Sequence, residues 1–559
     1  MSHLGQGDAP DRQETAVNRS RPRDKSTRWL IGVSSFVVAA TFLVSLMNFP
    51  PPTGDEGLYA SAAASLLERG TVGQTVYAVG DPWGRDTNTV TFGRSYVAGL
   101  ALMLRTFGVN LLAARAFSWM GWLLASLLVY WLGSLCFDRR VALLGAFLFA
   151  TSSKALFTAH LARPESWTTV GILLAVIAAI GALEAERLTV PVALFAGVMT
   201  VWPADFHGTG LAFSIGIALA VSLRLCQRRN WTGLMAYAGG MLIGLGTWLV
   251  MHIGLHGILD GVATFIGIFR PVRGGSSGDG QIRVVWLDRL TTLPQWGKAI
   301  FWTAGGPLSL MEGGLAVYGS LFAVFRGSRA DRTLLVIALG ALAAFGLLVP
   351  FRHLQYGILW TPFWYLLGTR AVLATGEWAA SRFALSPALT RNVVSLLLGL
   401  MVLGNYLGDL WLIYQWRGPD FKKTSEALAD LIPEHSRVIA DTTWWWVLRK
   451  DRVFIADDYF VTLSNGQDPT VQRFLGVNAP PSQYQLVELT LQKLRPDYVV
   501  MDSAFRSHSD PDPSWFTLKA ILQDRCSVVG SVAGPWANDV TRATTQLGQV
   551  STIYACSGW

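Results

Sequence analysis

The feature that most constrains this chain is a series of apolar segments long enough to cross a lipid bilayer. A membrane-spanning helix needs roughly 20 mostly apolar residues, and about eleven stretches of the sequence approach that length. The sequence therefore predicts a polytopic α-helical membrane protein. The predicted spans are residues 29–48, 110–137, 141–158, 166–183, 188–203, 209–226, 233–253, 301–325, 333–350, 355–375 and 392–414.

The composition agrees with this prediction. Of the 559 residues, 51% are hydrophobic and 15% are charged, which departs from the usual composition of soluble domains. We attribute the net charge of +8 to membrane topology, because Lys and Arg gather in the loops between spans. No segment resembles a nucleic-acid-binding module. The expected partners therefore include membrane lipids but no nucleic acid.

Positive charge predicts the orientation of the spans, because short cytoplasmic loops retain Lys and Arg. The polar tail 1–28 carries six of these side chains, so we place it in the cytoplasm and expect it to be disordered. With eleven spans, the even-numbered connections are also cytoplasmic, and each contains arginine. They are Asp138–Arg140, Glu184–Arg187, Arg224–Arg229, Arg326–Arg332 and the stretch holding Arg382 and Arg391. The first loop (49–109) and the C-terminus then lie outside the plasma or inner membrane.

The chain is expected to change character near residue 417. Residues 29–416 form the predicted transmembrane domain, and residues 417–559 have the composition of a soluble domain. Helical and β-like runs alternate there, which predicts a small extracytoplasmic α/β domain. The expected helices cover 421–432 and 484–494, and the β-like runs cover 437–440, 452–456, 497–501, 527–532 and 549–555.

Two of the four cysteines fall in this C-terminal domain. Cys526 and Cys556 each flank one of the last two β-like runs. An extracytoplasmic compartment is oxidising, so these two positions are candidates for a disulfide. No cysteine or histidine spacing indicates a zinc site.

An acidic pair, Asp55 and Glu56, follows the first predicted span. The prolines at 50–52 disfavour helix before this point, and Thr53 with Glu56 has the spacing of a capping box. We therefore expect both acids on the first turn of a helix that ends near Gly70. The alternative interpretation is that they only complement the helix dipole.

Further polar residues stand at the predicted outer ends of the spans. Arg163 and Glu165 lie in a very short connection. Charged side chains near a membrane cost free energy unless they pair or face a polar cavity. The two residues could also be an ion pair that anchors two helix ends. His207, in the next outer connection, is a candidate site residue or an interfacial structural histidine.

The fourth outer connection, 254–300, breaks the expected charge bias because it is rich in arginine and glycine. Arg270 belongs to it, and Arg352 and His353 form another basic cluster before span ten. Cations retained on this face suit an anionic partner such as phosphate, or they bind lipid headgroups in a solvated loop.

The order of these motifs resembles the GT-C glycosyltransferases. The motifs are Asp55-Glu56-Gly57-Leu58-Tyr59-Ala60 after the first span, Arg94 and Tyr96 before a juxtamembrane helix, the segment FGVNLLAARAFSWMGWLLASLLVYWLG, and HLARPESW from His160. Within that group the sequence is similar to the branch of protein O-mannosyltransferases and lipid A aminoarabinose transferases. The resemblance covers roughly residues 29–375.

The resemblance implies a role for each motif. The expected catalytic residues are Asp55, in the place of the catalytic carboxylate, and its neighbour Glu56, and the donor is a polyprenyl-phosphate sugar. Arg94 takes the place of the residue that meets the donor phosphate, although many members have Lys followed by prolines there. Arg163 and Glu165 match an Arg-x-acid motif in which Asp is common. The expected donor-phosphate residues are Arg94, Arg163, Arg270 and Arg352, and the expected substrate-binding residues are Tyr59, Tyr96, His160, Glu165, His207 and His353.

The residue types suit this chemistry. A hydroxyl acceptor needs a carboxylate to take its proton, and a departing lipid phosphate needs cations. We therefore expect direct displacement with inversion, with Asp55 as general base. The acceptor is a protein, a lipid or a polysaccharide. Outer-loop carboxylates could hold a divalent metal, but the acidic pair is not a specific metal signature, so no cofactor is assigned.

Two other functions fit the sequence. One is a transporter or flippase of a lipid-linked sugar, although transporters place such charges near the midplane rather than at one face. The other is a non-catalytic assembly protein whose C-terminal domain binds glycan.

Overall fold

The computed structural model describes most of the chain from Ser45 to Trp559 as one compact unit. The longest parts outside the described residues are 1–39, 254–306, 503–512 and 534–549, with shorter gaps that include 350–353 and 416–420. The predicted cytoplasmic tail, most of the first span, Arg270, Arg352 and His353 therefore lie outside the described residues.

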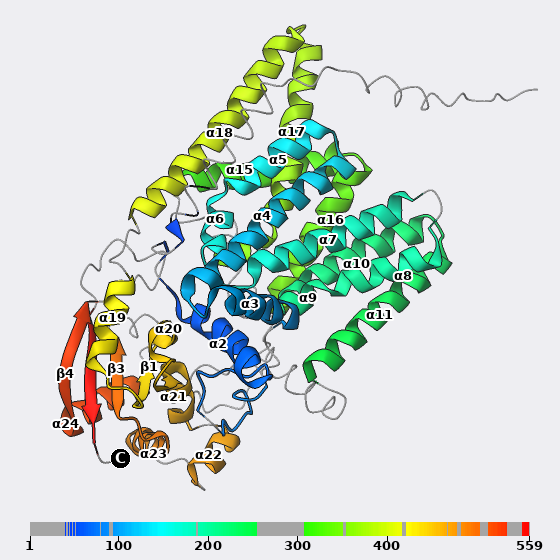
Figure 1. The fold of residues 1–559 in the computed structure, drawn as a ribbon. Helices are drawn as coiled ribbons and strands as arrows, with labels where there is room; N and C mark the ends of the chain where they lie inside the picture. Colours follow the sequence, from blue (N-terminus) through cyan, green and yellow to red (C-terminus); the bar gives the residue numbers. More distant parts are fainter. Residues whose placement is uncertain are drawn as a thin grey trace, which may run out of the picture. The chain divides into compact units, whose positions relative to one another are not determined.

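The described residues up to 415 form a helical region (Figure 1). In the described residues, each predicted span from residue 110 onward overlaps a helix or a pair of helices; residues 301–306 of the span 301–325 lie outside the described residues. The helices are α4 (Leu111–Cys136), α5 (Arg139–Ala150), α6 (Ser153–Ala159), α7 (Glu165–Glu184), α8 (Val190–Val201), α9 (Pro203–Phe206), α10 (Gly210–Gln227), α11 (Trp231–Ile253), α15 (Pro307–Phe325), α16 (Arg329–Leu348), the 3-10 turn η1 (Leu354–Leu359), α17 (Thr361–Arg382) and α18 (Pro387–Gln415).

Six of the described helices are long and apolar enough to cross a membrane, and a seventh span results if α5 and α6 count as one. These two helices are bent by 55° at a short break. Large apolar side chains are exposed on other helices of this region: Leu127 on α4 is 67% exposed, Leu242 on α11 70% and Phe325 on α15 77%. A surface of this kind suits lipid rather than water. The chain is an integral membrane protein.

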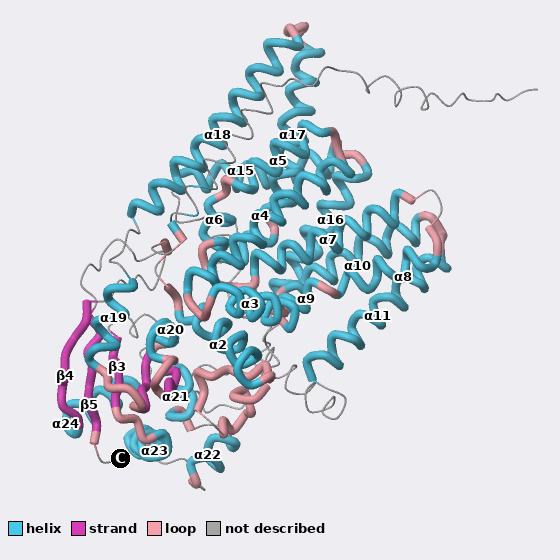
Figure 2. Tube along the Cα trace, viewed as in Figure 1, coloured by secondary structure: helices cyan, strands magenta, loops and turns pink. Residues whose placement is uncertain are grey.

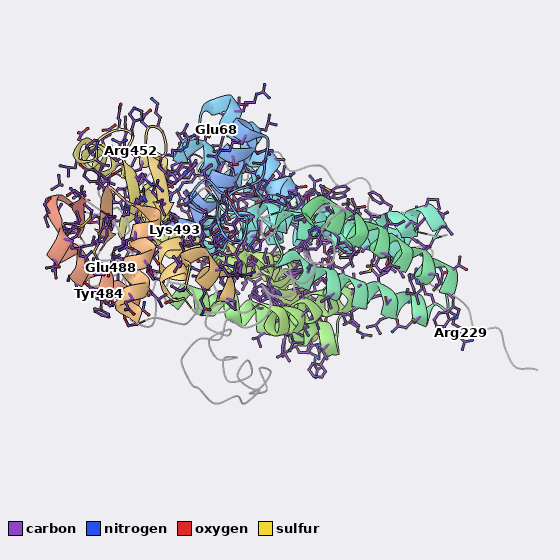
Figure 3. All side chains as sticks on the ribbon, turned by 90° about the horizontal axis from the view of Figure 1, so that it is seen from below. Glu68, Arg229, Arg452, Tyr484, Glu488 and Lys493 are labelled. Carbon is purple, nitrogen blue, oxygen red and sulfur yellow. A yellow bond between two sulfur atoms is a disulfide. The ribbon has the colours of Figure 1, made fainter. Side chains whose placement is uncertain are left out.

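The connections between helices gather at two ends. Figure 3 shows Arg229, in the basic loop between α10 and α11, at the end of the helices away from Glu68. Glu68 belongs to the first loop, and the labelled residues of the C-terminal domain lie on its side. This separation agrees with the charge pattern from which the topology is predicted.

The C-terminal domain contains a five-stranded sheet in the order β2-β1-β3-β5-β4 (Figure 2). β1 pairs in parallel with β2 and β3, whereas β5 is antiparallel to β3 and β4. The strands are β1 (Arg437–Ala440), β2 (Val453–Ala456), β3 (Tyr498–Asp502), β4 (Cys526–Ala533) and β5 (Val550–Cys556). The helices are α19 (Phe421–Leu431), the turn η2 (Thr442–Trp444), α20 (Trp445–Leu448), α21 (Asp457–Ser464), α22 (Pro469–Leu475), α23 (Gln483–Leu494) and α24 (Pro513–Arg525).

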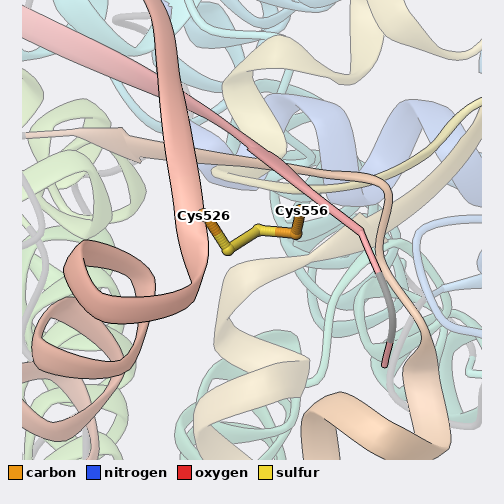
Figure 4. Close-up of a disulfide and its surroundings, with 2 residues drawn as sticks. All are labelled: Cys526 and Cys556. Atoms are coloured by element: carbon orange, nitrogen blue, oxygen red, sulfur yellow. A yellow bond between two sulfur atoms is a disulfide. The ribbon is translucent and has the colours of Figure 1, made fainter.

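This domain confirms the predicted α/β class and all of its predicted strands. Cys526 and Cys556 are register partners on β4 and β5, and a disulfide joins them (Figure 4). Trp444 and Trp445 are almost fully buried in the core of the domain. The sequence did not indicate α21, α22 or α24.

The first loop contains two helices, α2 (Gly54–Arg69) and α3 (Arg94–Phe107). The backbone N–H of Thr53 donates to Glu56 at 2.9 Å, which is the reciprocal half of a capping box. α2 ends at Gly70, whose φ of 70° is the left-handed conformation that glycine adopts without cost. The predicted helix start and end are confirmed.

Two hydrophobic cores share α2. Ala60 and Ala64 belong to the core of the C-terminal domain. Tyr59, Ala62 and Ala63, on another face of the same helix, belong to a core built with α3 and α4. The helix that carries the acidic pair is therefore held from both sides.

Candidate active site

Three of the predicted site residues form a chain of charges at the start of α2 and α7. The Arg163 guanidinium contacts the Asp55 carboxylate on one side. On the other side, its Nη2 lies 2.7 Å from Oε1 of Glu165. Arg163 and Glu165 are buried, but the Asp55 side chain is 41% exposed. Asp55 is thus the member of this chain that solvent or a substrate can reach.

The loop that carries Arg163 is fixed by its backbone. The Ser118 hydroxyl donates to the Arg163 carbonyl at 3.0 Å, and the Arg163 N–H lies 3.2 Å from the same hydroxyl. Pro164 then precedes the first turn of α7, where Glu165 is favourably placed with respect to the helix dipole. The sequence "ARPES" therefore folds into a short, rigid connection that aims Arg163 at Asp55.

Glu56 has different surroundings from its neighbour Asp55. Its carboxylate accepts two hydrogen bonds from Arg115, at 2.8 and 2.9 Å, and both side chains are fully buried. It also accepts from the backbone N–H groups of Thr53 and Ala162. All its nearby acceptor capacity is therefore used within the protein. This arrangement joins α2, α4 and the Arg163 loop at one point.

Aromatic side chains lie beside these charges. The rings of Tyr59 and Tyr96 lie 5.7 Å apart at their centroids, and His207 is 6.4 Å from Tyr59. Tyr356 lies 6.0 Å from His207 and hydrogen bonds to Arg163. Burial raises the pKa of Tyr59 well above its usual value, so its phenol stays neutral. These groups can bind and orient a sugar but cannot serve as charged bases.

His207 is held neutral by its environment. Burial lowers its pKa to about 4, with Glu165 opposing this shift and Arg163 adding to it. Its Nδ1 lies 2.7 Å from the hydroxyl of Thr209. A neutral imidazole near the Arg163–Glu165 pair is suited to hydrogen bonding with a substrate hydroxyl.

His160 lies apart from the exposed side of the site. Its Nε2 is 2.7 Å from the Ser45 hydroxyl and its Nδ1 is 2.8 Å from the Leu156 carbonyl. Both ring nitrogens therefore have protein partners, and the side chain is buried. Its contacts connect α6 to the segment before α2.

A second group of charges surrounds the start of α3. Arg94 donates to Asn88 at 2.6 Å and to the His252 carbonyl at 3.2 Å. Asp205 caps the same helix, because it accepts from the Ser95 N–H at 3.1 Å. Burial lowers the pKa of Arg94, and Asp205 opposes that shift. Among the described residues, the buried Nη1 of Arg94 has no hydrogen-bond partner.

The structure thus brings together Asp55, Arg163, Glu165, Tyr59 and His207, with Tyr96 against them. Arg94 stands in the neighbouring group with Asp205. The roles of these residues stay predictions. Sequence reasoning missed Arg115, Asp205 and Tyr356 as members of the site. For Arg115 a signal existed, since an arginine inside an apolar span needs a partner.

The described residues contain no group of three or more His, Cys, Asp or Glu side chains that could hold a metal ion. Asp55 and Glu56 point to different partners rather than to one centre. We therefore assign no metal to the described part of this site.

In comparisons with known proteins, no protein-family model and no curated protein matches the chain. Solved structures do match. ArnT from Cupriavidus metallidurans bound to undecaprenyl phosphate aligns with a TM-score of 0.60 and 14% identity, covering 95% of this chain and 98% of that one. The chain has the fold of the GT-C glycosyltransferases.

Two further structures complete this comparison. ArnT in the apo state aligns at 0.56 and 14% identity, covering 94% of this chain and 98% of that one. The oligosaccharyltransferase AglB from Archaeoglobus fulgidus aligns at 0.49 and 15% identity, covering 94% of this chain and 76% of that one. At these identities the likeness shows the GT-C fold alone. It confirms the predicted polytopic helical fold with a C-terminal domain.

Proposed function

We propose that the chain is a membrane glycosyltransferase that moves a sugar from a polyprenyl-phosphate donor to a protein, lipid or polysaccharide acceptor. The observation that carries the proposal is the half-exposed carboxylate of Asp55, bound to Arg163 within an otherwise buried group of charges. The GT-C fold supports it, since ArnT with undecaprenyl phosphate shares this fold.

Asp55 acts as general base in this proposal. An acceptor hydroxyl must lose its proton as it attacks the anomeric carbon, and a carboxylate within hydrogen-bond reach can take that proton. Asp55 is the accessible acid of its group, and Arg163 holds its orientation from behind. Glu165 in turn fixes Arg163.

Glu56 has a positioning role rather than a catalytic one. Its carboxylate is fully buried and is used by Arg115 and by two backbone N–H groups. A base needs a free lone pair that faces the substrate. Glu56 instead fixes the first turn of α2, so that the neighbouring Asp55 keeps its direction.

The lipid phosphate that leaves needs positive charge, because its negative charge grows as the bond breaks. Arg94 is suited to this role. Its guanidinium is partly buried, and its Nη1 has no hydrogen-bond partner among the described residues. Arg163 is the second described cation near the reacting centre. Arg270 and Arg352 stay candidates from sequence alone.

The stereochemistry follows from the number of groups available. A lipid phosphate leaves without protonation by a second acid, so one base and the cations suffice for direct displacement. We therefore propose inversion at the anomeric centre. Trapping a covalent glycosyl-enzyme on Asp55 would refute it.

The proposal also assigns the sides of the membrane. The positive charge of the loops opposite α2 places the N-terminus in the cytoplasm. The site and the C-terminal domain then face the extracytoplasmic side, where the chain would glycosylate the cell envelope.

The test uses purified protein in lipid, a panel of radiolabelled polyprenyl-phosphate sugars and a membrane extract as acceptor. The native chain is compared with Asp55→Asn, and Glu426→Gln serves as the matched control because that carboxylate is 60% exposed on α19. Transfer by the native chain and the control, with loss in Asp55→Asn, supports the proposal. Movement of labelled lipid across the bilayer without any transfer would replace it with the transporter interpretation.

A further inference from the structure

Two glycines bracket the acidic pair, and both face the C-terminal domain. A Cβ added to Gly57 would lie 2.1 Å from the backbone carbonyl oxygen of Thr442. A Cβ added to Gly54 would lie 2.4 Å from the Thr442 hydroxyl oxygen. Real Cβ atoms do not approach other atoms so closely, so glycine lets the backbones meet at Gly57 and lets the Thr442 side chain lie against the helix at Gly54.

The partner segment is itself well fixed. Thr442 begins η2 directly after β1, at the carboxyl end of a strand that is parallel to both of its neighbours. The N–H of Thr443 donates to Asp441 at 2.7 Å, which caps the turn. Trp444 and Trp445 then anchor the segment in the core of the domain. The C-terminal domain therefore presents a rigid turn to α2.

Other contacts hold the same two parts together. The Ala456 N–H, at the end of β2, donates to the Val76 carbonyl in the first loop at 2.8 Å. The Arg449 guanidinium contacts the Glu68 carboxylate near the end of α2. The C-terminal domain therefore contacts the last turn of α2 and the loop that follows it, and the glycine contacts lie at the other end of α2, which carries Asp55.

We propose that the turn at Thr442 of the C-terminal domain is a positioning element for Asp55, which it sets through the close approach of the Thr442 hydroxyl to Gly54 and of the Thr442 carbonyl to Gly57. This inference rests on the proposed transferase function. Asp55 lies between the two glycines, so a shift of the first turn of α2 moves its carboxylate relative to Arg163. Displacement of a catalytic group by about 1 Å can cost about a hundredfold in rate.

The two glycines allow a test with an internal control, because they meet different atoms of one residue. Gly54→Ala should lower transfer about tenfold, and adding Thr442→Ala should restore it, since the obstructing atom is the hydroxyl oxygen that this change removes. Gly57→Ala should lower transfer by more, about a hundredfold, and Thr442→Ala should not restore it, because a carbonyl oxygen remains in the way.

Kinetics separate this role from a general loss of structure. We expect kcat to fall while the KM for donor stays within about twofold, because the donor-phosphate groups are on other elements. Gly181→Ala on α7 is the matched control, since a Cβ there meets nothing within 4 Å. It should transfer sugar at the native rate.

A second measurement does not depend on catalysis. Cys136 and Cys226 are first replaced by serine, and Asp55→Cys is then alkylated with a water-soluble maleimide. Gly54→Ala should change the alkylation rate several-fold, and adding Thr442→Ala should reverse that change. Gly57→Ala should also change the alkylation rate, but adding Thr442→Ala should not reverse it.

The outcomes distinguish the two proposals. The positioning proposal is overturned if neither Gly54→Ala nor Gly57→Ala changes alkylation or transfer. It is also overturned if Thr442→Ala rescues the Gly54→Ala and Gly57→Ala variants equally. If the alkylation pattern appears but the native chain transfers no sugar, the positioning of residue 55 is supported and the transferase proposal has failed.

Discussion

Two groups of charged and polar side chains differ in whether one of their acids is exposed. The site group consists of Asp55, Arg163 and Glu165. The α6–α18 group lies among α6, α15, α17 and α18, and it consists of Lys154, Glu312, Tyr365 and Asp409. The site group has one acid that is 41% exposed. In the α6–α18 group, every member is buried.

The bonding within the α6–α18 group explains why it can stay closed. Lys154 Nζ lies 3.3 Å from Glu312, and the Tyr365 hydroxyl donates to the same carboxylate. Such pairs are retained in a membrane interior only when they satisfy each other. Their closure suits a role in holding four helices together. A reaction needs a carboxylate that the substrate can reach. The site group therefore suits a reaction, whereas the α6–α18 group suits the stability of the helix packing.

The largest expected effect comes from the open acid. Asp55→Asn keeps the size of the side chain but removes the lone pair that takes a proton, so sugar transfer should fall about a thousandfold. Binding of undecaprenyl phosphate, measured by its thermal shift, should stay at the native value. The same exchange at Glu426, an exposed control, should leave transfer unchanged. Native-level transfer by Asp55→Asn would remove the distinction between the two groups.

The next effect is on stability. Glu56→Gln leaves the Arg115 guanidinium buried without a counter-charge, which should lower the free energy of unfolding by about 3 to 5 kcal/mol. Thermal unfolding in detergent measures this loss. The double variant Glu56→Gln with Arg115→Met should recover part of it, because both charges are then gone. A Glu56→Gln protein as stable as the native chain would contradict the buried-pair argument.

The sequence predicted elements whose signals are local. The capping pattern at Thr53 and the glycine at residue 70 predicted both ends of α2, since each cap needs only neighbouring residues. The alternation of helix and strand predicted the α/β domain, and the cysteine positions made Cys526 and Cys556 candidates for the disulfide that the structure contains. Membrane-length apolar runs likewise located the helices.

What sequence could not supply was the pairing of distant residues. Asp55 and Glu56 are adjacent, yet one meets Arg163 and the other Arg115, and nothing in their spacing separates them. The contact of Gly57 with Thr442 joins residues far apart in the chain. Tertiary packing determines such partners. The sequence therefore indicated Asp55 and Glu56 as a pair, but it could not assign them different partners.

A smaller effect should follow from opening the α6–α18 group. Lys154→Met removes one partner of Glu312 but leaves the Tyr365 hydroxyl, so we expect a loss of about 3 kcal/mol, at the low end for a broken buried pair. Transfer per folded molecule should stay within about twofold of native. Adding Glu312→Gln should restore thermal stability, and a selective loss of transfer instead would assign this group to the site.

His207 predicts a pH dependence of stability. Its folded pKa of about 4 lies below the unfolded value near 6.5, so the unfolded chain binds more protons between these values. Stability from His207 is therefore fully present above about pH 6.5 and is lost as pH falls toward 4. His207→Gln should show a weaker fall in melting temperature from pH 7.5 to 5. An equal fall in both proteins would contradict a neutral imidazole at residue 207.

The smallest effect should come from a substitution of Asp409 in the α6–α18 group. Neither of its carboxylate oxygens has a hydrogen-bond partner among the described residues, although the side chain is fully buried. Burying a carboxylate without a partner costs more than burying the amide of the same shape. Asp409→Asn should therefore leave the melting temperature unchanged or raise it, and transfer should not change. A marked loss of stability would mean that Asp409 has a cationic partner outside the described residues, and the α6–α18 group would then match the site group in being fully paired around its acids.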